Sequence, residues 1–482
     1  MRRSVEKTFD VIVVGAGPGG SSIAALLSRK GLSTLLLDKA YFPRDKVCGD
    51  GLTPRALYWL DVLGCLDEVI GATRSCVTQA DLFINGEHAL TGDFPASGPY
   101  PGFCIILRRK VLDHILLRHA VAGGAAFRPG SVVKSLRWLS DRVVVEAVSE
   151  GAPVTFNAKI VIGADGANSM VSRALGNRIM EGATAVSLRG YYEGLPTGSA
   201  GIQIHFDEPF FPGYGWLFAD DTGTANVGVG YAVDRDFPLR GNLHQIYQRF
   251  IDTNLRQSLG NARPAGPPKG GWSSFFRPAT LVKERVLLIG DAANLGDPIS
   301  GGGIHMAMES AHVAAPVVLD ALARNDASAA SLGRYETAWN QRNELDWRVG
   351  DLFLTIAKNP DLREFWLHVL NLIAAMAKND ASFRQFAAGI FSGAAQSRSA
   401  FSPALWWQIV AMDPRIWLRA GAPLPETLLA ARRALASPLP TAGWLVEILT
   451  KVVRLAECYT RNEIPAALAE RRPQWPSVSW AL

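Results

Sequence analysis

A short segment with a single cysteine, "PRDKVCGDGLTP" at residues 43–54, carries residue types that suggest chemistry. A thiolate is a strong nucleophile, and nearby cations lower the pKa of a thiol. Arg44 and Lys46 would therefore favour a reactive thiolate at Cys48 if their side chains face it. A free cysteine often behaves instead as a small apolar residue that packs a loop. The segment predicts either a chemical role for Cys48 or a loop that only shapes a pocket.

A glycine motif, Gly15-x-Gly17-x-x-Gly20, lies closer to the N-terminus, after an apolar run and at the start of a helical pattern. In such a motif the first glycine allows a tight turn and the second lets a pyrophosphate approach the backbone. The third lets the helix and the strand pack closely. A helix N-terminus also favours the negative charge of phosphates. Asp38, which lies 18 residues after Gly20, would bind two ribose hydroxyls and repel a 2′-phosphate. The motif predicts a dinucleotide site, and by itself it does not separate FAD from NAD.

The elements around these residues follow a strand–helix–strand order. The apolar patterns predict strands over residues 10–14 and 33–39 and a helix over 21–31. A second helix is predicted over residues 52–64, because Thr53 can cap it, Pro54 suits its first position and Gly64 stands just past its end. These patterns predict an α/β opening in which Cys48 lies between the second strand and the second helix.

Later segments predict two further kinds of structure. Strands are indicated over residues 141–149 and 158–166, and alternating stretches between about 180 and 275 predict an antiparallel sheet. A Pro- and Gly-rich linker is expected over residues 261–271. From residue 331 onward helical patterns dominate, and this part holds nine of the thirteen tryptophans. Apolar stripes at helical spacing usually form core, although this end could also cover a substrate opening or lie on a membrane.

The bulk properties exclude several classes of protein. A chain of 482 residues predicts two or three structural units. A formal net charge of +5 without a dense basic tract argues against a nucleic-acid partner. Five cysteines without a CxxC motif predict neither a metal site nor a disulfide frame, and they favour a reducing, cytoplasmic setting. The first apolar run is too short for a signal peptide, and no run of about 18 apolar residues predicts a spanning helix.

Two later segments indicate the cofactor by resemblance. "VIGADG" (161–166) and "VLLIGDAANLGDPISGGGI" (286–304) resemble the DG and GD motifs of FAD-dependent enzymes with the para-hydroxybenzoate hydroxylase fold. The resemblance implies FAD, with Asp291 on its ribityl chain and Arg109 against the FAD chain. A helix that begins at 301–303 would direct its amides at the flavin N1/C2=O edge, where reduced flavin carries negative charge. The predicted cofactor-binding residues are Gly15, Gly17, Gly20, Asp38, Arg109, Asp165, Gly290, Asp291, Pro298, Gly301, Gly303 and Ile304.

The cysteine segment resembles a narrower group, the geranylgeranyl reductase family, which carries a PxxKxCG segment. Tyr214, Trp216 and Phe218 match that family's YxWxFP segment, and Gly228-x-Gly230 follows at the expected distance. Ala219 stands where the family has proline. The resemblance covers roughly residues 8–330 and leaves out the helical end. Members of this family saturate isoprenoid double bonds with reduced FAD as the hydride donor.

The resemblance places Cys48 near the isoalloxazine ring, where its thiol could tune or gate the flavin or donate a proton. Residues 214, 216 and 218 share one face of an alternating strand. Three aromatics on one face form either a sheet core or an apolar wall for a polyene chain, and the resemblance favours the wall. The predicted catalytic residues are Cys48, Tyr214 and Trp216, and no metal site is predicted.

The predicted fold is α/β: a Rossmann-like FAD-binding domain, an antiparallel β-sheet substrate domain as in para-hydroxybenzoate hydroxylase, and a helical C-terminal extension. The FAD-binding domain is expected over residues 1–78, 105–178 and 277–330. The substrate domain is expected over 79–104 and 179–276, and the helical domain over 331–482.

The predicted function is an FAD-dependent oxidoreductase that reduces carbon–carbon double bonds of a lipophilic isoprenoid or polyene by hydride transfer from reduced FAD. Because no second dinucleotide fold is indicated, NAD(P)H bound transiently or a protein electron donor would supply the electrons. We expect a lipophilic small-molecule substrate and a location that is either cytoplasmic or peripheral to a membrane.

Two alternatives use the same cofactor motifs. One is an FAD-dependent monooxygenase that hydroxylates or epoxidises a lipophilic natural-product intermediate. The other is a redox-neutral, FAD-containing cyclase of a polyketide polyene, for which the Trp-rich end and the missing proline at Ala219 leave room. A flavin halogenase is disfavoured, because its WxWxIP signature has no match in "GWLFAD".

Overall fold

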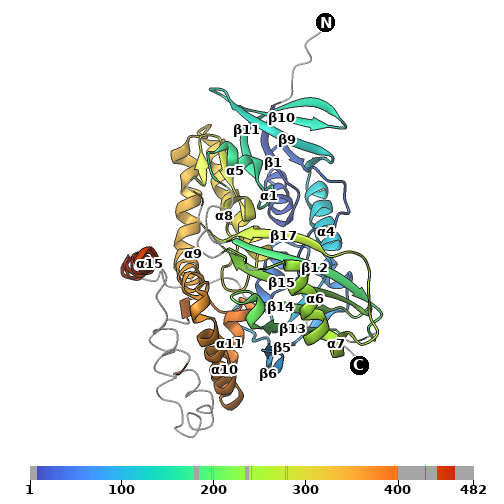
Figure 1. The fold of residues 1–482 in the computed structure, drawn as a ribbon. Helices are drawn as coiled ribbons and strands as arrows, with labels where there is room; N and C mark the ends of the chain where they lie inside the picture. Colours follow the sequence, from blue (N-terminus) through green and yellow to red (C-terminus); the bar gives the residue numbers. More distant parts are fainter. Residues whose placement is uncertain are drawn as a thin grey trace.

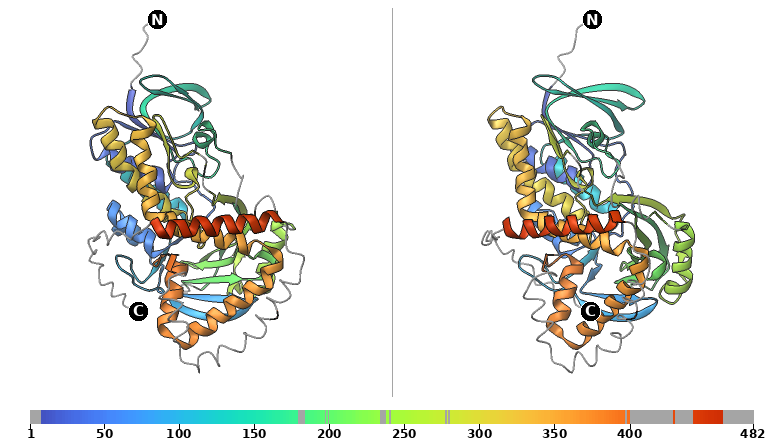
Figure 2. Two further views of the ribbon diagram at one scale, coloured as in Figure 1. Left: turned by 90° about the vertical axis from the view of Figure 1, so that its left-hand side faces the viewer. Right: turned by 60° about the vertical axis from the view of Figure 1, so that its left-hand side comes forward.

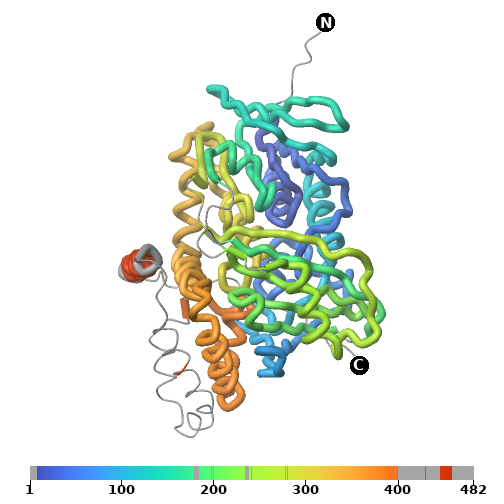
Figure 3. The backbone as a smooth tube through the Cα atoms, in the orientation of Figure 1, coloured from blue at the N-terminus to red at the C-terminus, as the bar shows by residue number. Residues whose placement is uncertain are grey.

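The computed structural model describes residues 8–178, 184–196, 198, 200–233, 238–239, 241–276, 278, 280–396, 398–399, 429 and 442–461. Within these ranges the chain forms two eight-stranded sheets, one three-stranded sheet and the helices that cover them (Figure 1). The backbone trace shows that the helices after residue 329 follow both large sheets along one side (Figure 3).

The first sheet has the strand order β18-β19-β11-β1-β2-β8, and β10 and β9 extend it from β11. Its central strands are parallel and almost wholly apolar, as expected of a sheet covered on both faces. The helices α1 (Pro18–Ser28) and α8 (Ile304–Ala323) share its core. The β1–α1–β2 unit confirms the predicted strand–helix–strand opening. The strands are β1 (Thr8–Val14), β2 (Thr34–Leu37), β8 (Ala126–Arg128), β9 (Ser131–Trp138), β10 (Val143–Ser149), β11 (Ala152–Gly163), β18 (Val282–Lys283) and β19 (Val286–Leu288).

The second sheet has the order β16-β12-β15-β14-β13-β5-β6, with β17 also on β12. Its pairs are antiparallel, as predicted, except that β13 and β5 run parallel. The strands are β5 (Gln79–Ile84), β6 (Glu87–Asp93), β12 (Thr184–Glu193), β13 (Gly201–Phe206), β14 (Gly215–Ala219), β15 (Thr224–Val233), β16 (Arg263–Pro264) and β17 (Lys269–Ser274). One face carries the helices α6 (Leu243–Phe250), η2 (Ile251–Leu255) and α7 (Arg256–Leu259), which share a core with the sheet.

The predicted linker at residues 261–271 is wrong in part. β16 lies within it and β17 begins within it, and both strands pair with the edge of β12. The Pro- and Gly-rich composition suggested a linker, but the pairing depends on a strand about 80 residues earlier. The exact domain boundaries stay a prediction, although each large sheet takes its strands from separate chain segments.

A small third sheet packs against the second sheet. It consists of β3 (Gly51–Leu52), β7 (Cys104–Ile106) and β4 (Cys76–Val77), and the helices α2 (Pro54–Leu63), α3 (Leu66–Gly71) and α4 (Arg109–Ala122) pack beside it. Thr53 accepts a hydrogen bond from the Ala56 amide, and Gly64 ends α2 with φ 76°. Both predicted caps of this helix are confirmed.

The helical end begins with the long α9 (Ala329–Ala357), which runs beside both large sheets (Figure 1). α10 (Arg363–Asn379) and α11 (Ala381–Ser392) follow and contact β5 and β6. α15 (Ala442–Arg461) lies across α9, and Figure 2 shows this crossing. The predicted helices of this end are confirmed where they are described. Residues 400–428 and 430–441 of this end lie outside the described residues.

One helix in the described part of the chain, α8, is long and apolar enough to cross a membrane by length and composition alone. Within its most apolar window, 61% of the segment is buried inside the protein. α8 packs against α1, α2 and α9. The burial explains its composition as that of a core helix.

Candidate active site

A cavity of about 1290 Å³ extends from the carboxyl ends of the first sheet's strands to α10 and α11. The crevice at the carboxyl ends of parallel strands is where open α/β sheets bind ligands. Pockets for one ligand usually measure about 300–1,000 Å³. This cavity therefore has room for a cofactor and a second molecule.

Two helices begin at the cavity without a side-chain cap. Gly17 precedes α1 and Gly303 precedes α8; both residues line the cavity, and neither helix start has a capping side chain. The first amides of a helix lack partners within it and form its positive end. Gly15 has φ +101°, and a Cβ there would lie 2.3 Å from the Ala164 carbonyl oxygen. The cradle fits the two electron-rich parts of FAD: the diphosphate at α1 and the flavin N1/C2=O edge at α8.

Three predicted acidic residues line this end of the cavity. Asp38 directly follows β2 and is fixed by the amides of Ala16 and Ala40, at 2.7 and 2.8 Å from its two oxygens. Asp291 lies in η3 (Gly290–Ala293), and a Cβ on Gly303 would be 3.3 Å from its Oδ1. Asp165 accepts hydrogen bonds from Ser169 and from the first amides of α5 (Met170–Ala174). Its carboxylate therefore holds the turn in place.

Eleven of the twelve predicted cofactor residues line the cavity, Gly290, Pro298, Gly301 and Ile304 among them. Gly20 does not line it. A Cβ at Gly20 would lie 1.7 Å from the Gly15 carbonyl oxygen, so this glycine lets α1 pack against the turn. That is the packing role expected of the third glycine in the motif.

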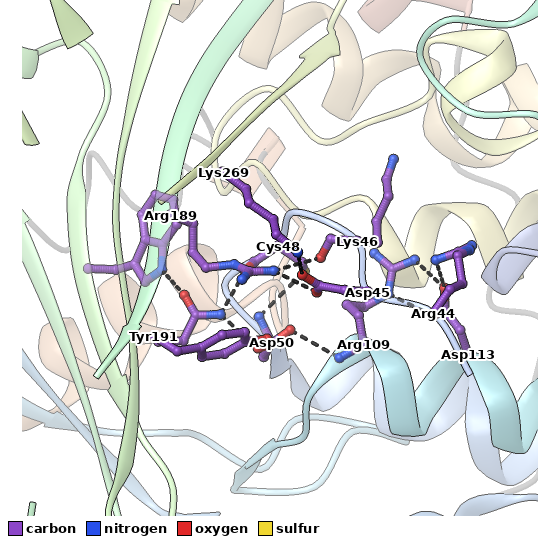
Figure 4. A network of polar contacts seen from close by, with 12 residues as sticks. Arg44, Asp45, Lys46, Cys48, Asp50, Arg109, Asp113, Arg189, Tyr191 and Lys269 are labelled. Carbon is purple, nitrogen blue, oxygen red and sulfur yellow. Dashed lines mark hydrogen bonds and ion pairs between the residues drawn. The ribbon is translucent and has the colours of Figure 1, made fainter. Parts of the chain in front are cut away.

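The cysteine loop is clamped by ion pairs from two directions (Figure 4). From the second sheet, Arg189 donates to Asp45 at 2.8 Å and to the Lys46 carbonyl at 3.0 Å. Burial alone would raise the pKa of Asp45, but hydrogen bonds from Lys269 and Arg189 lower it below its usual value. From α4, Asp113 pairs with Arg44 at 2.9 Å. Arg44 therefore faces the Asp113 carboxylate. The two cations of the second sheet, Arg189 and Lys269, pair with Asp45 and not with Cys48.

Behind the loop lies a buried hydrogen-bond network. Asp50 is 1% exposed and adopts φ 67°. Its carboxylate accepts from the Tyr191 hydroxyl at 2.6 Å, from Asn226 Nδ2 at 2.7 Å and from the Arg109 amide at 3.1 Å. Asn226 Nδ2 also donates to the Cys48 carbonyl at 2.8 Å, and Asn226 Oδ1 accepts from Trp216 Nε1 at 2.9 Å. One amide side chain thus fixes both the cysteine loop and the tryptophan.

Cys48 lines the cavity and is a free thiol. Burial raises the pKa of this thiol, and the positive charge of Arg109 only partly offsets that effect. Arg109 is itself held by Asp113, through two hydrogen bonds of 2.7 and 2.8 Å. The condition for a lowered pKa, that Arg44 faces the thiol, is not met because Arg44 pairs with Asp113, and burial raises the pKa of Cys48 instead.

The aromatic residues of β14 and the segment before it form a row beside this loop. Tyr214 and Trp216 line the cavity, and the Tyr214 hydroxyl donates to the Ser300 carbonyl at 3.0 Å. The Tyr214 and Trp216 rings are 5.9 Å apart, and Trp216 and Phe218 are 6.5 Å apart. Phe218 lies outside the cavity lining, so the predicted wall consists of two aromatics, and the third packs behind it.

The glycines of the two family segments make room for these rings. A Cβ on Gly228 would lie 2.1 Å from Trp216 Cζ2, and one on Gly49 would lie 2.9 Å from Phe218 Cε2. A larger side chain at either position would displace the aromatic ring. The cysteine segment and the aromatic segment are therefore two halves of one packing unit.

The far end of the cavity is an apolar chamber, formed by α9, α10, α11 and residues 206–212. On α10 and on α11 most of the lining residues follow the i, i+3, i+4, i+7 spacing of one helix face. The residues with this spacing are Trp366, Val369, Leu370 and Ile373 on α10, and Phe383, Phe386, Ala387 and Ile390 on α11; Leu372, Met376 and Phe391 also line the chamber. Each helix therefore directs an apolar face toward open space in the cavity. The notion of the helical end as a cover for a substrate opening agrees with this placement.

Comparison with known proteins identifies the family. A model described as an FAD binding domain matches residues 8–192. The menaquinone reductase of Mycobacterium tuberculosis is 33% identical over 327 residues, which cover 65% of this chain and 78% of that protein. Digeranylgeranylglycerophospholipid reductase 2 of Methanopyrus kandleri is 29% identical over 343 residues, covering 69% and 82%. The chain belongs to the geranylgeranyl reductase family of FAD-dependent oxidoreductases.

Solved structures agree with this family in fold. A geranylgeranyl bacteriochlorophyll reductase-like protein of Thermoplasma acidophilum superposes with a TM-score of 0.63 at 24% identity, over 86% of this chain and 99% of that one. A flavoprotein/dehydrogenase of Cytophaga hutchinsonii gives 0.66 at 18% identity, over 80% and 93%. The superposition with the Thermoplasma protein covers 86% of this chain, which is more than residues 8–330 could supply. Part of the helical end is therefore matched as well. The expectation that the likeness stops near residue 330 is therefore wrong for the fold.

Several residues of the site had no signal in the sequence. Asn226, Arg189 and Tyr191 come from strands of the second sheet, and only the packing of that sheet brings them to the loop. Asp113 had a signal, because it stands four residues after Arg109, which is the spacing at which opposite charges pair on a helix. The roles of the cofactor and catalytic residues stay predictions for this member of the geranylgeranyl reductase family.

Proposed function

We propose that the protein reduces carbon–carbon double bonds of a lipophilic isoprenoid or polyene with electrons from reduced FAD. One observation carries the proposal: a continuous cavity joins the FAD motifs to the apolar chamber, with Cys48, Tyr214 and Trp216 in its lining. The names of the two relatives, a menaquinone reductase and a digeranylgeranylglycerophospholipid reductase, support it, since both substrates carry prenyl chains.

Bound FAD would supply the hydride for one alkene carbon, and NAD(P)H or an electron-donor protein would reduce it. The chain's own residues would do three things. The two helix N-termini and Asp38 hold the cofactor, and the chamber holds the alkene and excludes water. The Cys48 thiol, protonated at neutral pH, holds the proton that the other alkene carbon needs. Hydride and proton together saturate the bond, and the cysteine regains its proton from water.

The same proposal places the enzyme in the cytoplasm, at the surface of a membrane that stores its lipophilic substrate. Binding of the purified holoprotein to phospholipid vesicles that contain a prenylated lipid would support the membrane contact, and no binding to such vesicles would contradict it.

An anaerobic titration tests the proposed function. The visible flavin absorbance is followed as NADPH, NADH or dithionite is added, and a prenylated lipid is then introduced without oxygen. Re-oxidation by the lipid, with a saturated product, is the expected result. Re-oxidation only by oxygen would replace the reductase with a monooxygenase. Turnover of a polyene by oxidised protein without any reductant would replace it with a redox-neutral cyclase.

A further inference from the structure

Charge is distributed unevenly around the cavity. The charged residues in its lining are Asp38, Lys39, Arg44, Asp45, Lys46, Arg109, Asp165, Arg173 and Asp291. All of them belong to the segments around the FAD motifs and the cysteine loop. Among the described residues, the apolar chamber has no charged side chain in its lining. The cationic part of the cavity is thus the part that the cofactor would fill.

Arg363 is a cation close to the chamber. It donates to the Tyr231 hydroxyl at 3.3 Å, and Tyr231 lines the cavity while Arg363 does not. The phenol therefore stands between this guanidinium and the open space. A ligand in the chamber meets aromatic and aliphatic side chains instead.

This distribution restricts the headgroup of a substrate. An anion that leaves water without meeting a cation is strongly disfavoured, whereas an uncharged carbonyl or hydroxyl costs far less. We propose that the chamber selects electroneutral lipids, such as a quinone or a free prenyl chain, and rejects phosphorylated ones. The inference rests on the proposed function and narrows it, since the named relatives include both a quinone reductase and a phospholipid reductase.

Geraniol and geranyl diphosphate test this inference on the FAD-loaded protein. The two ligands have the same prenyl chain and differ only in the headgroup. Because the chain is short, the headgroup must enter the cavity with it. Binding is measured by equilibrium dialysis, and entry into the site by re-oxidation of the reduced flavin without oxygen. We expect the diphosphate to bind at least tenfold more weakly than the alcohol. Equal or tighter binding of the diphosphate would overturn the inference.

A matched pair of variants on α11 locates the selection. Ala387 lines the chamber, and its neighbour Ala388 does not. Ala387→Lys should shift the ratio of the two affinities toward the diphosphate by at least tenfold, and Ala388→Lys should keep the wild-type ratio. An unchanged ratio in Ala387→Lys, in protein that retains its flavin and its melting temperature, would contradict the chamber as the site of selection. If this variant does not fold, the comparison of geraniol with geranyl diphosphate on the wild-type protein still tests the inference.

The inference and the proposed function fail in different ways. Should both ligands re-oxidise the flavin equally, the selection is refuted and the reductase stands. Should neither these ligands nor any longer prenylated lipid re-oxidise it, both are refuted.

Discussion

Asn226→Leu should release the cysteine loop while leaving the rest of the protein folded. The substitution keeps a side chain branched at Cγ but removes three hydrogen bonds, in a residue that is 2% exposed. The Trp216 indole N–H and the Cys48 carbonyl lose the partner that Asn226 provides. Asp50 keeps its bonds from Tyr191 and from the Arg109 amide. Two buried groups left unpaired cost about 1–3 kcal/mol each, so the loop should lose about 2–6 kcal/mol.

Hydrogen exchange measures this loss locally, which matters because a multidomain chain need not unfold in one step. Every 1.4 kcal/mol is a factor of about ten, so amides of residues 44–52 should exchange about 30-fold faster or more. Asn254→Leu is the control. Asn254 lies on η2, and its amide side chain donates to Asp207 at 3.0 Å and makes no hydrogen bond to the cysteine loop. Unchanged protection in Asn226→Leu, or an equal loss in the control, would refute the assigned role of Asn226.

Three further predictions follow from single contacts. Burial lowers the pKa of His205 from 6.5 to about 4. The folded state therefore loses about 3 kcal/mol of stability as the pH falls from the pKa of His205 in the unfolded chain through its pKa in the folded protein. His205→Phe should melt at a higher temperature than wild type in acid, and an equal acid sensitivity of the two proteins would count against this. Burial raises the pKa of Cys48 above its usual value of 9.0, so iodoacetamide should label this thiol slowly at neutral pH and faster in alkaline buffer. Rapid labelling at neutral pH would contradict the protonated thiol. Gly228→Ala would push a Cβ to 2.1 Å from the Trp216 ring, whereas Gly230→Ala leaves 3.8 Å; we expect the first to slow flavin re-oxidation by lipid at least tenfold and the second to stay near wild type, and equal effects would argue against the packing.

The cofactor side of the site could be predicted because its signals are local. The turn at Gly15, the start of α1 and the acid at the end of β2 lie within one short stretch, and each has a physical reason that belongs to its own position. The caps of α2 were predictable for the same reason. Neither the pairing of β17 with β12 nor the clamp by Arg189 is local, since both depend on how a distant strand packs.

The protonation of Cys48 illustrates the limit most clearly. The sequence places Arg44 and Lys46 within four residues of the thiol and suggests a lowered pKa. In the structure Arg44 pairs with Asp113, and desolvation dominates at the thiol. The cations near Cys48 in the sequence suggested a lowered pKa, whereas burial raises the pKa. Only the three-dimensional partners decide between a thiolate and a thiol.

The departure of this chain from the family segment at Ala219 can be judged from strand geometry. Successive side chains of β14 point to opposite faces of the sheet. Tyr214 and Trp216 line the cavity, whereas Leu217 and Ala219 belong to the core that the sheet forms with α6. Ala219 is 2% exposed and lies on the face of the sheet away from the cavity. The alanine therefore changes the packing under α6 and not the wall of the cavity, and it gives no reason to prefer a redox-neutral cyclase over a reductase.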